Sequence, residues 1–206
     1  MLVISTPVPE LRELADSLGA EWLGFPRMDE ATPEALEPIR VATRAEAGFR
    51  HVVVALWAEQ VEEGALVELD DESWSLRAER PLLAWCVGMG IASRCVADGG
   101  AIVALVESPA PIDSEGLTPE ASVAEGAIVL ARSLAQSEGP RGVRVNAVTT
   151  CARLGGGALA PPPALADRYP GAVGDEVTGA IRLLLSDDAA GMTAGVTHVD
   201  CGRTLR

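Results

Sequence analysis

The sequence contains no lysine. All 16 of its basic residues are arginine, against 30 acidic residues, and the net charge is −14. Any mechanism that needs an ammonium side chain is therefore excluded. The negative charge repels nucleic acid and anionic membrane surfaces, so we expect neither as a partner. Aromatic residues make up only 3% of the chain, with a single tyrosine, Tyr169.

Long apolar runs are also missing, although 48% of the 206 residues are apolar. No stretch approaches the roughly 20 apolar residues that a membrane-spanning helix needs. The first five residues have neither the basic segment nor the small-residue cleavage site of a secretory signal. We therefore expect a cytoplasmic protein with one domain over residues 1–206.

Metal-binding patterns are absent as well. The two histidines, His51 and His198, lie far apart, and the cysteines show no C-x-x-C spacing. The four cysteines are Cys86, Cys95, Cys151 and Cys201. We expect buried reduced thiols rather than a metal site.

Short apolar runs alternate with longer helical segments along the chain. Runs rich in β-branched residues predict strands, and the segments between them, bounded by proline and glycine, predict helices. The predicted strands are 2–5, 21–25, 51–57, 101–106, 143–148 and 196–200. The predicted helices are 9–18, 33–47, 73–97, 119–136 and 174–186, and 155–163 is a predicted loop. Pro81 lies inside one predicted helix, so we expect a bend near Arg77–Pro81.

This alternation predicts a doubly wound α/β domain, in which a parallel sheet is covered by helices on both faces. The pattern shows no internal repeat and no linker that would divide the chain. One domain is therefore the interpretation that the sequence favours.

From about His51 to its end, the sequence resembles the short-chain dehydrogenase/reductase (SDR) family. AIVLARSLAQSEGPRGVRVNAV, over 127–148, is similar to that family's long helix, turn and R-V-N-x-V strand. LLSDDAAGMTAGVTHVDCG, over 184–202, resembles its closing pattern, which ends in V-D-G-G. The resemblance implies a Rossmann-like sheet of the SDR type. Only a short segment precedes His51, so we expect a shortened N-terminal half with little room for a third strand and its helix.

SDR chemistry uses a Tyr-x-x-x-Lys pair on the long helix and a serine upstream of it. The resemblance places Glu120 at the tyrosine position, Ala124 at the lysine position and Glu107 at the serine position. Ser108 lies one residue further on and is a weaker candidate, since it can also be an ordinary turn residue. With no lysine in the chain, no alignment can produce the motif, whatever the position of Tyr169.

The glycine-rich cofactor loop of the family, T-G-x-x-x-G-x-G, is missing too. The first predicted strand leads into Thr6-Pro7-Val8-Pro9-Glu10, and no glycine precedes Gly19. Prolines have no amide hydrogen to offer a phosphate, and a glutamate would repel one. We therefore predict that this chain does not bind a dinucleotide.

An SDR scaffold without SDR chemistry predicts a non-catalytic subunit that assembles with an active SDR paralogue. NAD or NADP would then belong to the partner subunit. The resemblance implies pairing through 73–97, 119–136 and 174–202, because these segments form the family's subunit interfaces.

Two alternatives stay open. In the first, Glu107 and Glu120 face one cleft and perform acid/base chemistry of a lyase or isomerase type, which requires that burial raise the pKa of one carboxyl. The interpretation that we favour for both is a solvated or salt-bridged carboxylate. In the second alternative, the chain is a sensor that binds a small molecule in the degenerate cleft.

Overall fold

The computed structural model describes residues 1–42, 48–58, 63–109, 115–151 and 173–205. Tyr169 and the predicted loop over 155–163 lie outside these ranges, as does the last part of the helix predicted over 33–47. Within the described ranges, no helix is both long and apolar enough to cross a membrane.

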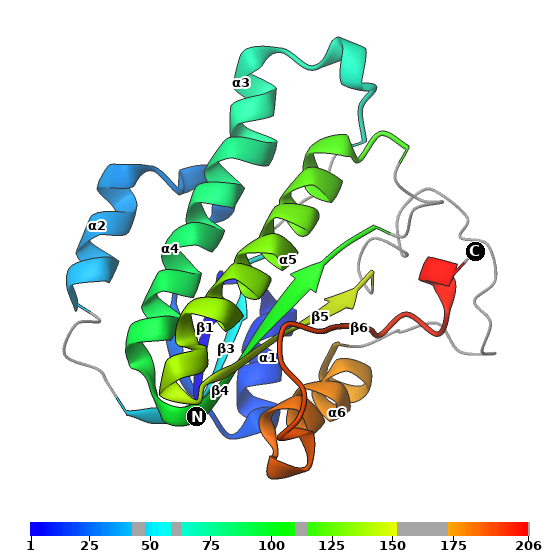
Figure 1. Ribbon diagram of the computed structural model, residues 1–206. Helices are drawn as coiled ribbons and strands as arrows, with labels where there is room; N and C mark the ends of the chain where they lie inside the picture. Colours follow the sequence, from blue (N-terminus) through cyan, green and yellow to red (C-terminus); the bar gives the residue numbers. More distant parts are fainter. Residues whose placement is uncertain (43–47, 59–62, 110–114, 152–172, 206) are drawn as a thin grey trace.

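Six strands in this described part form one parallel sheet, in the order β2-β1-β3-β4-β5-β6 (Figure 1). They are β1 (Leu2–Ser5), β2 (Glu21–Gly24), β3 (Phe49–Ala55), β4 (Val96–Glu107), β5 (Arg144–Thr150) and β6 (Val196–His198). The strand order reverses between β1 and β3, which confirms the doubly wound topology. No described strand lies beyond β2, so the N-terminal half is shortened as predicted.

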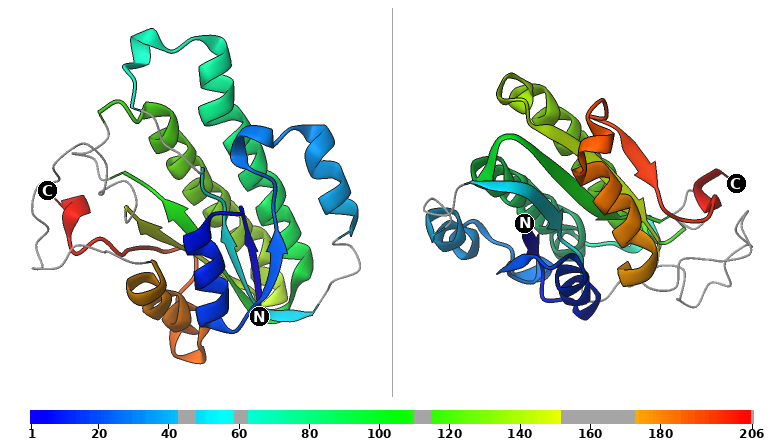
Figure 2. Two further views of the ribbon diagram at one scale, coloured as in Figure 1. Left: turned by 180° about the vertical axis from the view of Figure 1, so that it is seen from behind. Right: turned by 90° about the horizontal axis from the view of Figure 1, so that it is seen from below.

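Helices cover both faces of the sheet (Figure 2). One face carries α1 (Pro9–Leu18) and α6 (Val173–Leu185), and the other carries α2 (Pro33–Ala42), α4 (Arg80–Cys95) and α5 (Thr118–Glu138). Side chains alternate between the two faces along each strand. In β3, Val52 and Val54 join the core beneath α2, α4 and α5, whereas Val53 joins the core beneath α1 and α6.

Proline and glycine fix the ends of α1, as the sequence predicts. Pro9 occupies the first turn, where its missing amide hydrogen costs no hydrogen bond. Gly19 ends the helix in the left-handed conformation, with φ 61°. Its backbone amide donates hydrogen bonds to the carbonyls of Ala15 and Asp16.

The helix predicted over 73–97 is interrupted where a bend was expected. It starts as α3 (Asp71–Trp74), continues through a π-helical segment (Ser75–Glu79) and then becomes α4, which contains Pro81 in its first turn. Such π segments mark local distortions of a helix. The predicted end at residue 97 is wrong, because Val96 is extended and pairs with Phe49 of β3.

Candidate functional site

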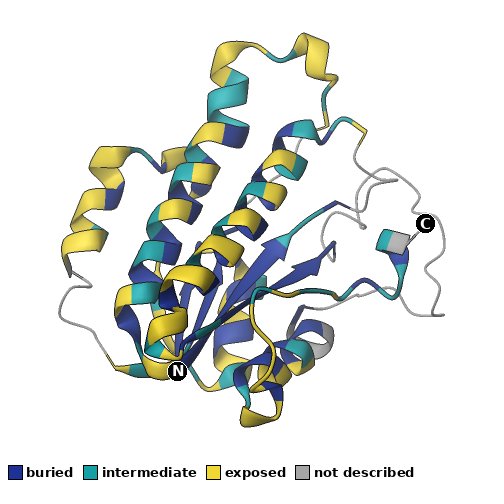
Figure 3. Cartoon of the chain, in the orientation of Figure 1, coloured by how far each residue is buried: buried dark blue, intermediate teal, exposed yellow. Residues whose placement is uncertain are grey.

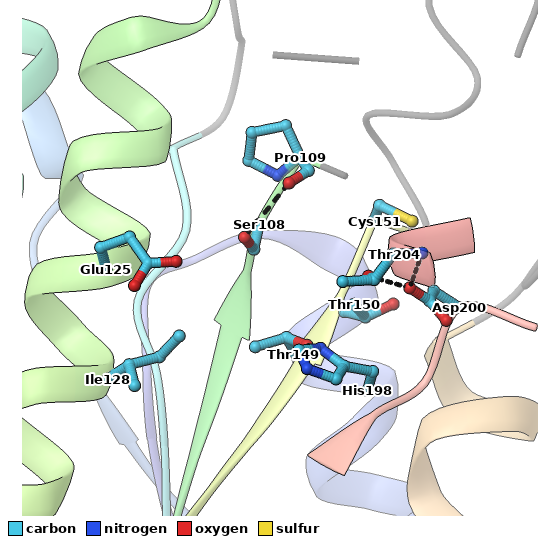
Figure 4. A pocket seen from close by; sticks show the side chains of 10 residues that line it. All are labelled: Ser108, Pro109, Glu125, Ile128, Thr149, Thr150, Cys151, His198, Asp200 and Thr204. Atoms are coloured by element: carbon cyan, nitrogen blue, oxygen red, sulfur yellow. Dashed lines mark hydrogen bonds between the residues drawn. The ribbon is translucent and has the colours of Figure 1, made fainter. Parts of the chain in front are cut away.

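A small cavity lies at the carboxyl ends of β4 and β5, between α5 and β6 (Figure 4). The carboxyl ends of parallel strands meet at one edge of the sheet, which is where α/β domains bind their ligands. The volume of the cavity is about 70 Å³, enough for a few water molecules. Its lining residues are Ser108, Pro109, Glu125, Ile128, Thr149, Thr150, Cys151, His198, Asp200 and Thr204.

The register of β5 and β6 brings a threonine and a histidine together in one wall of this cavity. Thr149 lies directly opposite His198 in the parallel pair. The hydroxyl of Thr149 and Nδ1 of His198 are 2.7 Å apart, within hydrogen-bond distance. The structure thus places His198, which no pattern in the sequence assigns to a site, in the lining of the cavity.

Asp200 lines the same cavity. The strand predicted over 196–200 ends at His198, so Asp200 lies in a turn, where its carboxylate accepts hydrogen bonds from the amides of Gly202 at 2.9 Å and Thr204 at 2.7 Å. The hydroxyl of Thr204 is a third donor to this carboxylate. Burial raises the pKa of Asp200, but these hydrogen bonds from Thr204 and Gly202 outweigh it, so the pKa lies below its usual value.

Helix α5 contributes a carboxylate from the opposite side. Glu125 points into the cavity in Figure 4. Ile128 lies on the same face of the helix, three residues further along. Ala124, which occupies the lysine position of the family, is 1% exposed and belongs to the core.

Of the two candidates for the family's serine position, Ser108 lines the cavity and Glu107 does not. Glu107 is the last residue of β4, half-buried and paired with Thr150 of β5. The amide of Ser108 donates to the carbonyl of Thr150 at 2.9 Å, which continues the strand pairing for one more residue.

Glu120 does not line the cavity either; it forms a two-point ion pair with Arg77. Nε and Nη2 of Arg77 each lie 2.8 Å from one carboxylate oxygen of Glu120. The two side chains are 18% and 16% exposed. The structure therefore does not bring Glu107 and Glu120 together in this cavity.

A large buried side chain follows β3, next to the point where the strand order reverses. Trp57 is 2% exposed, and its indole nitrogen donates to the carbonyl of Leu105 at 3.1 Å. The hydroxyl of Thr6 donates to the carbonyl of Trp57 at 2.9 Å and accepts from the amide of Trp57 at 3.0 Å. These bonds tie the segment after β1 to the segment after β3.

The cavity thus combines hydroxyl groups, an imidazole and carboxylates, which can bind a small polar molecule or exchange a proton with it. Among the described residues that line it, none carries a phenol or an ammonium group. Among the described residues, no group of three or more His, Cys, Asp or Glu side chains is arranged to hold a metal ion.

Sequence reasoning did not select Glu125, Thr149 or His198 as cavity residues. Glu125 is not at one of the family's catalytic positions, although its neighbour Ala124 is. Thr149 and His198 meet only through the register of two strands distant in sequence. The available signal was the end of each predicted strand, since such ends converge at one edge of a parallel sheet.

Sheet order, helices on both faces and a cavity at the carboxyl ends of the strands define a Rossmann-like α/β protein. A family model described as enoyl-(acyl carrier protein) reductase matches residues 3–153. The chain belongs to this family of short-chain dehydrogenases/reductases. No curated protein matches it.

Solved structures of SDR proteins share the fold over nearly the whole chain. A blue fluorescent protein from a metagenomic library, in complex with NADPH, has a TM-score of 0.78 at 16% identity and covers 98% of this chain and 97% of its own. FabI from Candidatus Liberibacter asiaticus has a TM-score of 0.76 at 14% identity, with coverage of 100% and 95%. A short-chain dehydrogenase from Burkholderia cenocepacia J2315, in complex with NADP, has a TM-score of 0.73 at 20% identity, with coverage of 98% and 86%.

Proposed function

We propose that this chain is a non-catalytic SDR subunit that assembles with an active SDR paralogue. The observation that carries the proposal is the state of the catalytic positions. Glu120, at the tyrosine position, is bound at both oxygens by Arg77, and Ala124, at the lysine position, is buried in the core. Loss of a general acid alone typically lowers a rate by about 10²–10⁴-fold. The scaffold is retained while the proton-donor pair is not.

The segment after β1 lacks the features that bind a pyrophosphate, which supports assigning NAD or NADP to the partner subunit. The hydroxyl of Thr6 in this segment is already hydrogen-bonded to the backbone of the buried Trp57. Pro7 and Pro9 flank the start of α1 and offer no amide hydrogens to a pyrophosphate.

Exposed apolar side chains on α4, α5 and α6 support pairing through the predicted segments. Leu82 of α4 and Val129 of α5 are exposed. The two helices pack against each other, and both carry exposed residues along their length (Figure 3). A Cβ atom at Gly126 would lie 2.7 Å from Leu82 Cδ1, so Leu82 lies directly against α5. Leu183 of α6 and Met192 beyond it are also exposed. Subunit interfaces bury apolar side chains of this kind at their centres.

Co-expression with SDR paralogues encoded nearby tests this proposal. The chain should purify with an active paralogue as a complex of defined mass, measured by native mass spectrometry. Val129→Asp should weaken the complex at least about tenfold, because it buries an unpaired charge in the interface. Val67→Asp is the matched control: Val67 is 93% exposed and lies outside α4, α5 and α6, so its replacement should leave the complex intact.

The assembly would be contradicted if the chain elutes alone with every paralogue while remaining folded. It would also be contradicted if Val129→Asp and Val67→Asp have the same effect on the complex. A chain that forms only homo-oligomers would also overturn the heteromeric arrangement.

A second candidate function, a small-molecule sensor, is favoured by the polar side chains that converge on the cavity. His198 and Thr149 share a hydrogen bond there, and Glu125 projects from the other side. If the isolated chain is a sensor, a matching ligand will raise its melting temperature, because ligand binding stabilises the folded state. Glu125→Gln should abolish that shift, whereas a shift that persists would place the ligand elsewhere.

A further inference from the structure

A second and larger cavity lies at the opposite edge of the sheet, where β3, β4 and β5 begin. Its volume is about 220 Å³. This edge lies near the chain's N-terminus, labelled in Figure 1. The charged side chains in its lining are Arg50, Arg144 and Asp187, with His51 beside them. None of these residues belongs to the cavity at the carboxyl ends of the strands.

An irregularity of the sheet opens this cavity. Phe49 of β3 pairs with Val96 of β4, but His51 pairs with Ala101, so Arg50 alone faces the segment 97–100. Such bulges re-aim side chains at the rims of sheets and near functional sites. Gly100 completes the wall without a side chain: a Cβ atom there would lie 2.6 Å from the backbone oxygen of Arg50. Gly100 and Arg50 thus both line the cavity.

The two arginines place positive charge in the wall of this cavity on a chain of net charge −14. Arg144 is held in place by the carbonyls of Leu184 at 2.7 Å and Ser186 at 3.0 Å. Arg50 pairs only at the surface: its Nη2 lies 2.6 Å from Asp187, and the two side chains are 66% and 86% exposed. Exposed ion pairs contribute little stability. An incoming anion can therefore replace Asp187 at Arg50 at small cost.

The titration of His51 reports the same local charge. Burial lowers the pKa of His51, and the neighbouring charges of Arg50, the amino group of Met1 and Arg144 lower it further, while Asp187 raises it. An anion in the cavity would act in the direction of Asp187. It would raise the pKa of His51 and would bind more tightly as the pH falls and His51 becomes protonated.

We propose that this cavity binds a small oxyanion of the phosphate type, held by the Arg50 guanidinium and His51 in the field of Arg144. Arginine forms two parallel hydrogen bonds to phosphate oxygens, a geometry that its planar fork favours. The ligand is either free phosphate or a small phosphomonoester. The site is separate from the SDR catalytic positions. Leu185, Asp187 and Ala190 of its lining lie within the segment 174–202 that is proposed for subunit pairing, so the test uses the isolated chain.

NMR of the isolated chain tests this site, with inorganic phosphate and glycerol phosphate as separate probes. The chain has only two histidines, so the ring signal of His51 is the one lost in His51→Gln. Either probe should raise the pKa of His51, and Arg50→Gln should weaken binding by about tenfold or more. Arg132→Gln is the matched control, since it removes the same charge from an exposed position on α5. It should leave the affinity unchanged.

Tighter binding of inorganic phosphate would assign the free ion as ligand, and tighter binding of glycerol phosphate would assign a phosphomonoester. The proposal is overturned if neither probe changes the titration of His51. It is equally overturned if Arg132→Gln weakens binding as much as Arg50→Gln, because the attraction is then general and not local.

Discussion

Glu120, which the family resemblance places at the SDR tyrosine position, is held in an ion pair with Arg77. Arg77 binds both carboxylate oxygens and also donates to the carbonyl of Gly116 at 3.2 Å. The guanidinium thus links the π-helical segment before α4 to the start of α5. The ion pair is the salt-bridged state that the sequence interpretation favours for Glu120.

Glu120→Gln should lower the free energy of unfolding by about 2 kcal/mol, because it removes charge-assisted hydrogen bonds and leaves the Arg77 cation poorly compensated in a half-buried place. Urea denaturation at neutral pH measures the change. Glu79→Gln, at an exposed position, should stay within about 0.5 kcal/mol of the unmodified chain. Equal effects of the two substitutions would show that the ion pair makes no net contribution to stability.

Gly88 and Gly90 of α4 differ in the space that a side chain would have at each position. A Cβ atom at Gly88 would lie 2.8 Å from Leu56 Cδ1 and 3.3 Å from Val54 Cγ1, so this glycine lets the helix lie close to the strand β3 and the residue after it. At Gly90 no atom lies within 4 Å of such a Cβ. Leu56 and Val54 are both buried, so neither has room to move away.

We therefore expect opposite effects from the same substitution at these two sites. Gly90→Ala should stabilise the chain by about 0.5–1 kcal/mol, the usual gain in helix propensity. Gly88→Ala gains the same propensity but overpacks the core, so the two variants should differ by about 1–3 kcal/mol in urea denaturation. If they unfold at the same urea concentration, α4 is not held to the sheet by a close approach at Gly88.

Elements with a strong local pattern could be predicted from the sequence, whereas the composition of the cavity could not. The bounds of β1 and α1 agree with the prediction because apolar runs, Pro9 and Gly19 are local signals. The end of α4 was misplaced, since the extension of β4 back to Val96 depends on pairing with Phe49. The cavity depends on register in the same way: Thr149 meets His198 only because β5 and β6 pair, and no local pattern contains that contact.

The whole molecule shares its layered fold with structural neighbours that contain NADPH or NADP, but its segment after β1 has no glycine and carries Pro7 and Pro9. Thr6 in that segment is hydrogen-bonded to the backbone of Trp57, whose buried indole donates to the carbonyl of Leu105 in β4. These hydrogen bonds connect the segments after β1 and β3 with β4. Prolines in that segment offer no amide hydrogens to a pyrophosphate.

NADPH at millimolar concentration should therefore leave the melting temperature of the purified chain unchanged. A ligand present at about 100 times its Kd stabilises a protein by about 2.7 kcal/mol, so binding with a micromolar Kd would be plain in a thermal-shift measurement. The Burkholderia cenocepacia dehydrogenase, whose structure contains NADP, serves as the positive control. Trp57→Ala should not restore binding, because the segment before α1 still offers Pro7 and Pro9 where a phosphate needs amide hydrogens. A saturable rise in melting temperature with NADPH would contradict this prediction and remove the ground for assigning the cofactor to a partner subunit.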